Sequence, residues 1–252
     1  MRPAARSRPR RRIVRRLALG VAFLALAGAA TFLVQPLWLA DVLAFAFPGI
    51  LWRVRTAAPL VALSFDDGPA PDHTPQVLDC LARHQARATF FLIGDRAAAH
   101  PEMVRALRER GHEIGNHSYT VRSSLHLSDA EFRENLLRTE AVLGLGGPLK
   151  LYRPPGGVIR PAHLAFVRAQ GYRCVLGSAY PFDPAHPPAG YIRWLVGKNL
   201  APGTIVILHD GIADPSRMLQ SLDAILDEGR RRGLRFVPVG ELLKGARPLP
   251  AT

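Results

Sequence analysis

The stretch Ser64-Phe65-Asp66-Asp67-Gly68-Pro69 decides how this chain is interpreted. It continues an apolar run, Leu60–Leu63, that is typical of a buried strand, and it ends in two adjacent carboxylates and a Gly-Pro turn. Neighbouring carboxylates repel each other unless a cation or a proton lies between them. If Asp66 and Asp67 have different roles, one can be a ligand of a divalent metal while the other accepts a proton from a metal-bound water. A solvated turn is the structural alternative.

The sequence on either side of this stretch alternates short apolar runs with amphipathic segments. This alternation predicts an α/β fold, a distorted (β/α) barrel of about seven parallel strands with outer helices, and leaves an open doubly wound sheet as the alternative. The predicted strands are 60–65, 88–93, 113–116, 150–153, 173–176, 204–208 and 234–237. The predicted helices are 74–85, 101–110, 128–143, 160–169, 190–200 and 214–232.

Polar side chains follow four of the predicted strands. The two aspartates end the first strand, His117 ends the third, Arg153 ends the fourth and His209 ends the sixth. In a parallel barrel the carboxyl ends of the strands meet at one rim, where chemistry gathers. We therefore expect these side chains to form one site.

With these motifs the chain resembles the polysaccharide deacetylases of the NodB-homology type, carbohydrate esterase family four. The resemblance covers roughly residues 60–243 and is carried by residues 64–69, 88–94, 111–117 and 207–210. It implies a metal-dependent hydrolase that removes acetyl groups from N-acetylated glycans, either peptidoglycan or chitin-like oligomers, by attack of a metal-bound water.

The resemblance also implies roles for individual residues. Asp67 and His117 would bind a divalent metal, with zinc as the expected ion. Asp66 would be the general base, Arg153 would keep its carboxylate ionised, and His209 would protonate the departing amine.

Three further residues are expected to contact the substrate. The backbone N–H that follows Pro155, that of Gly156, would stabilise the oxyanion, and Leu208 would line the pocket for the acetyl methyl group.

The chain departs from the family pattern at three places. Val121 stands where the family has a second metal-binding histidine, and His126 is a possible substitute. Gly156 replaces an aromatic residue, and no aspartate-tryptophan motif follows the fifth strand, where Asp183 is the nearest carboxylate that could orient His209. A catalytically impaired protein that binds envelope glycans without cleaving them is therefore the first alternative function, and a scaffold for an envelope complex is the second.

The N-terminal region differs in composition from the body. Eight of the 33 basic residues lie within the first 16 positions, whereas the chain from residue 56 onward carries 23 basic and 19 acidic side chains. Leu17 to Val34 contains no charged residue and is long enough to cross a bilayer as a helix. A basic flank before an apolar segment predicts a cytoplasmic N-terminus and an exported body, so we expect a periplasmic or cell-surface catalytic domain and no nucleic-acid partner.

These observations predict five segments. They are a basic cytoplasmic arm (1–16), a transmembrane signal anchor (17–35), an apolar interfacial linker (36–57), the deacetylase domain (58–245) and a tail (246–252). Cleavage after Ala27-Gly28-Ala29 and a second membrane span at 36–52 stay open as alternatives. Cys80 and Cys174 are predicted to be buried free thiols, and the protein is expected to be a monomer.

Overall fold

The computed structural model describes residues 8–245, so the first part of the predicted basic arm and the predicted tail lie outside it. The chain divides after Pro36 into two compact units. The first contains helix α1 (Arg8–Val34). Its segment Arg15–Val34 has a mean hydropathy of 2.3 and is long and apolar enough to cross a membrane. This helix is the candidate for the predicted membrane segment.

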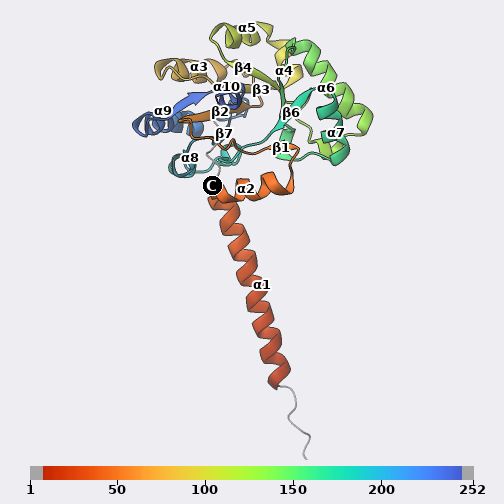
Figure 1. The fold of residues 1–252 in the computed structure, drawn as a ribbon, viewed down its shortest axis with the longest axis vertical. Helices are drawn as coiled ribbons and strands as arrows, with labels where there is room; N and C mark the ends of the chain where they lie inside the picture. The colour runs from red at the N-terminus through yellow and green to blue at the C-terminus, as the bar shows by residue number, and fades with distance from the viewer. Residues whose placement is uncertain (1–7, 246–252) are drawn as a thin grey trace, which may run out of the picture. The chain divides into compact units, whose positions relative to one another are not determined.

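The second unit is built on a curled sheet in which all strand pairs are parallel (Figure 1). The strand order is β1-β6-β5-β4-β3-β2-β7, and β8 also pairs with β2. The strands are β1 (Ile50–Leu51), β2 (Leu60–Asp66), β3 (Thr89–Leu92), β4 (Glu113–Asn116), β5 (Lys150–Tyr152), β6 (Tyr172–Val175), β7 (Ile205–His209) and β8 (Arg235–Val237). The seven predicted strands are thus β2 to β8.

The curled sheet is joined across its open side next to β7. Ala179, just after β6, forms a parallel bridge with Val206 of β7, and the Ile207 N–H donates to the Ala179 carbonyl at 2.9 Å. The predicted distorted barrel is confirmed, and the open doubly wound sheet is excluded by this connection.

Strand β2 is buried along its whole length because it has neighbours on both edges and side chains on both faces. Val61, Leu63 and Phe65 join the apolar cluster that contains residues of the outer helices. Ala62 joins a second cluster with residues of β3, β5 and β7. Since side chains alternate along a strand, the Ala62 face also carries the two polar residues Ser64 and Asp66. The alternation therefore points the first catalytic candidate into the barrel.

Helices surround this sheet (Figure 1). Six of them coincide with the predicted helices to within about two residues. The helices of the second unit are α2 (Leu37–Ala46), α3 (Thr74–Arg83), α4 (Gly94–Ala99), α5 (Pro101–Glu109), α6 (Asp129–Leu143), α7 (Pro161–Ala169), α8 (Ala189–Asn199), α9 (Ser216–Arg231) and α10 (Val239–Lys244).

The segment between α1 and β2 is part of the second unit. Ile50 and Leu51 form β1 against β6, and the Val54 N–H donates to the Gly203 carbonyl at 2.9 Å. Helix α2 buries Ala40 but leaves Phe45 90% exposed. No strand is predicted from the sequence of this segment, so β1 is seen only in the structure.

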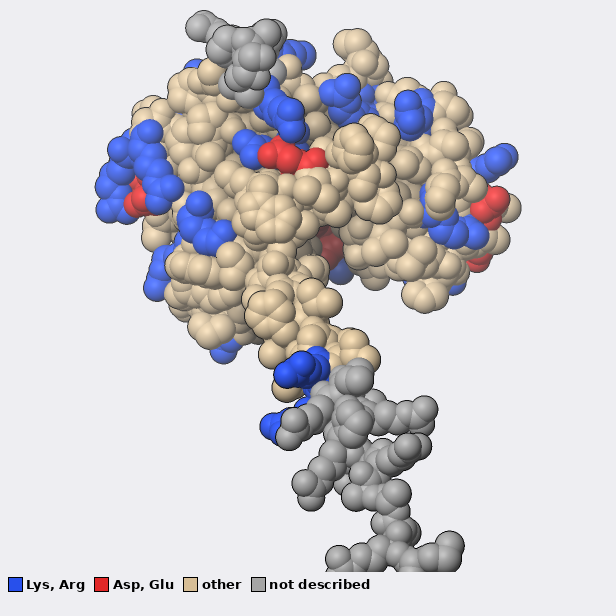
Figure 2. Space-filling view, turned by 60° about the horizontal axis from the view of Figure 1, so that its bottom comes forward, with Lys and Arg blue, Asp and Glu red and all other residues tan. Residues whose placement is uncertain are grey.

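The surface carries its basic side chains in separate groups. Figure 2 shows Lys and Arg side chains scattered over one face of the molecule, with acidic side chains between some of them. No continuous basic band crosses the part of this face that the structure describes.

Candidate active site

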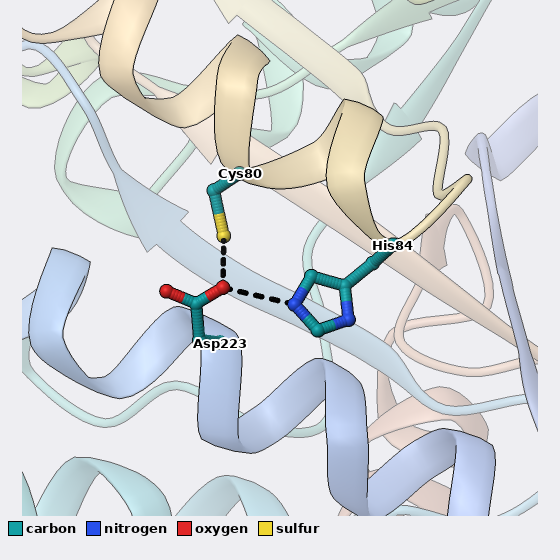
Figure 3. Close-up of side chains that lie close together, drawn as sticks. All are labelled: Cys80, His84 and Asp223. Atoms are coloured by element: carbon teal, nitrogen blue, oxygen red, sulfur yellow. Dashed lines mark hydrogen bonds and ion pairs between the residues drawn. The ribbon is translucent and has the colours of Figure 1, made fainter.

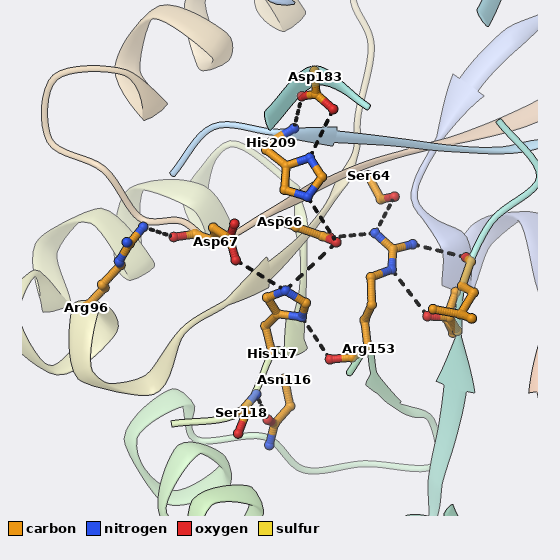
Figure 4. Close-up of polar contacts among 12 residues, drawn as sticks. Ser64, Asp66, Asp67, Arg96, Asn116, His117, Ser118, Arg153, Asp183 and His209 are labelled. Carbon is orange, nitrogen blue, oxygen red and sulfur yellow. Dashed lines mark hydrogen bonds and ion pairs between the residues drawn. The ribbon is translucent and has the colours of Figure 1, made fainter. Parts of the chain in front are cut away.

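The first pair of the site is Asp66 and Arg153, both buried (Figure 4). Asp66 is the last residue of β2, and Arg153 directly follows β5. The Arg153 Nη1 donates to Asp66 Oδ1 at 2.5 Å and to Ser64 Oγ at 2.8 Å. Its other nitrogens donate to the carbonyls of Val175 and Leu176, both at 3.2 Å. The guanidinium is therefore held at four points, and the second oxygen of Asp66 is left to face the rest of the site.

His117, just after β4, lies against this pair. Its Nδ1 is 2.8 Å from the Arg153 carbonyl, which can only accept, so Nδ1 carries a hydrogen. Its Nε2 lies 3.3 Å from Asp67 Oδ1 and 3.9 Å from Asp66 Oδ2. The Nε2 of His117 thus points at two carboxylates.

Asp67 reaches this position because its backbone turns sharply after β2. Its φ of +68° lies in the left-handed region, which aspartate tolerates better than most residues. Its carbonyl accepts from Arg96 Nη1 at 2.5 Å. Burial alone would raise the pKa of Asp67, but His117 lowers it below its usual value.

His209 approaches Asp66 from the other side. It ends β7 in register with Asp66 of β2, and its Nε2 lies 4.0 Å from Asp66 Oδ2. Its Nδ1 is 3.1 Å from Asp183 Oδ1, and its backbone N–H donates to Asp183 Oδ2 at 2.7 Å. Burial alone would lower the pKa of His209, but Asp183, and then Asp66 and Asp67, raise it to about 9. His209 is therefore a cation at neutral pH, oriented by a buried carboxylate.

The donor set at Asp67 and His117 fits two ligands of a divalent metal. With the hydrogen on Nδ1, a neutral His117 turns its Nε2 lone pair toward carboxylate oxygens, an arrangement that is repulsive unless a proton or a metal ion lies between them. Catalytic zinc usually has three protein ligands. In the described part of the chain no third carboxylate, histidine or cysteine atom completes a ligand group here.

The two positions at which a third metal ligand is expected, 121 and 126, lie on the surface. Val121 is 55% exposed and has no atom that can bind a metal. His126 ends a short 3-10 helix (Ser124–His126), is exposed, and accepts from Arg122 through its backbone carbonyl. The structure thus does not bring His126 into a ligand group with Asp67 and His117 among the described residues.

The predicted substrate contacts divide into two groups. Pro155 is buried and opens a 3-10 turn next to Arg153, in which Gly156 has a φ of +72° that favours glycine. Leu208, by contrast, packs in the cluster shared with the outer helices, because it lies on the opposite face of β7 from His209. The interpretation of Leu208 as a pocket residue is therefore not supported; Ile207 is on the face of His209.

Several residues of the site were not assigned a role from the sequence. Arg96 of α4 donates to the carbonyls of Asp67 and Gly211, at 2.5 and 2.6 Å. Thr74, at the start of α3, donates to Asp210 Oδ2 at 2.5 Å, and burial raises the pKa of Asp210 to about 7. Only the Asp210 contact had a signal in the sequence, namely its place directly after His209.

Three comparisons with known proteins bear on this site. Residues 53–175 match the family model described as polysaccharide deacetylase. A peptidoglycan-N-acetylglucosamine deacetylase of Bacillus cereus is 40% identical over 199 residues, which cover 77% of this chain and 93% of that protein. The crystal structure of the Bc1960 peptidoglycan N-acetylglucosamine deacetylase, in complex with an N-hydroxy-benzamide, matches with a TM-score of 0.75 and 28% identity, over 82% of this chain and 98% of that one.

A further solved structure resembles the chain in fold alone. It is BA3943 of Bacillus anthracis, described as a pseudoenzyme of carbohydrate esterase family four, with a TM-score of 0.69 and 23% identity over 77% of this chain and 68% of that one. The sequence relative from Bacillus cereus is well above this level of identity and is matched over nearly its whole length. On the family match and this relative together, the chain belongs to the polysaccharide deacetylase family, carbohydrate esterase family four.

Proposed function

We propose that this protein removes the acetyl group from N-acetylglucosamine units of an envelope glycan, with peptidoglycan as the first substrate to test. The observation that carries the proposal is the position of Asp66 Oδ2, 3.9 Å from His117 Nε2 and 4.0 Å from His209 Nε2. The relative that is 40% identical is named for this reaction on peptidoglycan. Amide hydrolysis needs a base for water and an acid for the leaving nitrogen, and this arrangement brings candidates for both roles together at one rim.

Asp67 and His117 are the residues that would hold the metal, with zinc as the proposed ion. When bound there, a divalent cation would polarise the acetyl carbonyl and lower the pKa of a water. His117 is prepared for this role because its Nδ1 is fixed on the Arg153 carbonyl, which directs Nε2 into the site.

Asp66 is the proposed general base. Arg153 occupies its Oδ1, so only Oδ2 is available to accept a proton from the attacking water. The same contact holds the carboxylate plane in one orientation, which favours transfer along a single direction. Arg153 is thus a positioning residue in this scheme.

His209 is the proposed general acid. It is protonated at neutral pH because its pKa is about 9, and Asp183 holds Nδ1 so that Nε2 faces the reaction. An N–H donor at Nε2 can deliver its proton to the amine as the C–N bond breaks. After proton transfer the neutral imidazole and the carboxylic acid of Asp66 can exchange the proton, which resets both groups.

The rim loop after Arg153 is the proposed oxyanion site. Gly156 lies in the left-handed region and is exposed in the turn that Pro155 begins. A backbone N–H in this place would stabilise the negative charge on the former carbonyl oxygen.

The proposed location is the outer side of a membrane. In this proposal residues 1–16 are a cytoplasmic arm, 17–35 a signal anchor and 36–57 an interfacial segment, and the deacetylase domain faces the cell envelope. The support is the apolar helix Arg15–Val34 and the exposed apolar side chains of α2, among them Trp38 at 57% and Phe45 at 90%.

Binding of the glycan without cleavage is the second candidate function. One observation favours it, namely the valine at position 121, which leaves two protein ligands in place of the usual three. The retained pair of proton-transfer residues favours the enzyme instead.

Acetate release tests the proposed function. The full chain in detergent is incubated with peptidoglycan and with N-acetylglucosamine oligomers, with added zinc and with chelator. We expect release that requires metal and that falls by about 10²–10⁴-fold in Asp66→Asn, the usual contribution of a general base. Asp79→Asn, which changes an exposed carboxylate on the outer helix α3, is the matched control.

Two outcomes would contradict the proposal in different ways. Full activity in Asp66→Asn would remove this residue from the mechanism. No release by the folded wild-type chain on any substrate, with glycan binding retained, would favour the second candidate.

A further inference from the structure

A second group of side chains with atoms that can serve as metal ligands lies on the outer helices (Figure 3). Cys80 and His84 are four residues apart at the C-terminal end of α3, so they share one face of this helix. Asp223 comes from the facing helix α9. The three ligand atoms lie within 4.8 Å of one another, and they are the one such group among residues that the structure describes.

The distances within this group are close to those around a tetrahedral zinc ion. Cys80 Sγ lies 3.3 Å and His84 Nε2 lies 2.9 Å from the same oxygen, Asp223 Oδ1. Zinc bond lengths of about 2.0–2.3 Å at tetrahedral angles place ligand atoms about 3.4–3.6 Å apart. To reach these separations, the distance from Asp223 Oδ1 must grow by about 0.1–0.3 Å to Cys80 Sγ and by about 0.5–0.7 Å to His84 Nε2.

The surroundings also suit a metal that comes from solution. The side chain of Asp223 is 52% exposed and that of His84 is 13% exposed, whereas Cys80 is buried. A group of ligands with one buried sulfur and one exposed carboxylate can admit an ion from solution and leave its fourth position to water.

We propose that Cys80, His84 and Asp223 bind a zinc ion that joins α3 to α9. The mixture of one thiolate, one imidazole and one carboxylate is a ligand set that zinc accepts. Binding breaks the Cys80 S–H bond, forms the zinc–sulfur bond and releases one proton to solvent.

Arg83 competes with the ion for this site. Its Nη2 donates to both oxygens of Asp223, at 2.9 and 3.1 Å. The Arg83 side chain is 59% exposed, so it can turn into solvent when the ion takes its place. The strength of zinc binding therefore depends on a residue that is not itself a ligand.

The site lies away from the catalytic candidates. It is at the C-terminal end of α3, whereas the other end of this helix begins at Thr74, which donates to Asp210 beside His209. Residues 80 and 223 are 143 positions apart, so the ion would connect two distant parts of the chain. Its role is to stabilise the fold, and it does not depend on the proposed deacetylase reaction.

Cobalt titration of the full chain in detergent tests the proposal, because Co²⁺ replaces Zn²⁺ and a cobalt–thiolate bond absorbs in the near ultraviolet. We expect this band in the wild type, its loss in Cys80→Ser and its weakening in His84→Ala and Asp223→Asn. Asp67→Asn is the matched control for the rim, where no cysteine is a candidate ligand, and it should keep the band. Zinc added to the chelator-treated chain should raise Tm by a few degrees more in wild type than in Cys80→Ser.

Arg83→Gln keeps the test informative if a ligand variant fails to fold. It removes the competing cation and leaves the three ligands, so the cobalt concentration needed for half of the band should fall. A wild-type chain without the band, or a band that persists in Cys80→Ser, would overturn the proposal. Equal cobalt affinity in wild type and Arg83→Gln would overturn the role given to Arg83.

Discussion

The molecule carries two groups of aspartate, histidine and arginine side chains that differ in their surroundings. At the barrel rim, the side chains of Asp66 and Arg153 are almost fully buried. The Nε2 atoms of His117 and His209 lie 3.9 and 4.0 Å from the Asp66 carboxylate. Between α3 and α9, Asp223 and Arg83 pair at a half-exposed surface. The same residue types thus interact with different strengths. In the buried group the nearby carboxylates interact strongly with His209 and raise its pKa, whereas solvent weakens the interaction of Asp223 with Arg83.

Arg153→Met gives the largest expected effect and tests the comparison directly. Removing one partner of a buried ion pair leaves Asp66 uncompensated, so we expect the free energy of unfolding to fall by about 3–5 kcal/mol. Denaturant unfolding at neutral pH, in metal-free protein, measures it. Arg83→Met, at the exposed pair, is the matched control and should leave the midpoint almost unchanged. Equal losses in the two variants would show that burial does not separate these pairs.

Asp183→Asn is expected to have the next largest effect, on pH dependence. The pKa of His209 is raised from 6.5 to about 9. The stability that protonated His209 contributes to the folded state is therefore fully present below about pH 6.5 and is lost as the pH rises through about 9. Without the Asp183 charge the pKa of His209 should fall, and the alkaline limb of activity should move to lower pH, with roughly tenfold less activity at pH 8.

Two measurements check the role of Asp183. They are an NMR titration of the His209 imidazole in metal-free protein and the pH profile of kcat/KM. Asp227→Asn, near His84 in the exposed group, should leave the profile unchanged. A profile that is identical in Asp183→Asn and wild type would rule out His209 as the acid whose charge Asp183 maintains.

Val121→His is expected to have the smallest effect and concerns the number of ligands in the two groups. The rim offers two, whereas the outer group offers three. A histidine at 121 restores the spacing of the family pattern, so the zinc concentration for half-maximal acetate release should fall by roughly tenfold, about 1.4 kcal/mol of binding. Val121→Gln is the control of similar polarity. No difference between the two variants would mean that a third histidine at this place does not limit the enzyme.

Much of the fold could be predicted because its signals are local. The apolar run before Asp66 and the amphipathic segments between strands follow from side-chain periodicity alone, and each predicted strand appears in the sheet. Strand β1 was missed because two residues within an apolar segment carry no periodicity, and their pairing with Cys174 and Val175 is a long-range contact.

Part of the site, too, could be predicted from the sequence, and part could not. The expectation that Asp66, His117, Arg153 and His209 meet at one rim agrees with the distances, since parallel strands bring their carboxyl ends together. Leu208 was misplaced because the two-residue period of β7, counted from His209, directs it to the outer helices. Arg96 had no signal, because its contacts with Asp67 and Gly211 join residues that are 29 and 115 positions away.

The sequence by itself determined the family, the strand and helix segments and the identity of the proton-transfer candidates, because these depend on residue type and spacing along the chain. The tertiary structure decided which oxygen of Asp66 is free, which charge orients His209, and which thiol lies beside a histidine and a carboxylate between two helices. These are matters of distance and burial, and the chain acquires them only when segments far apart in sequence pack against each other.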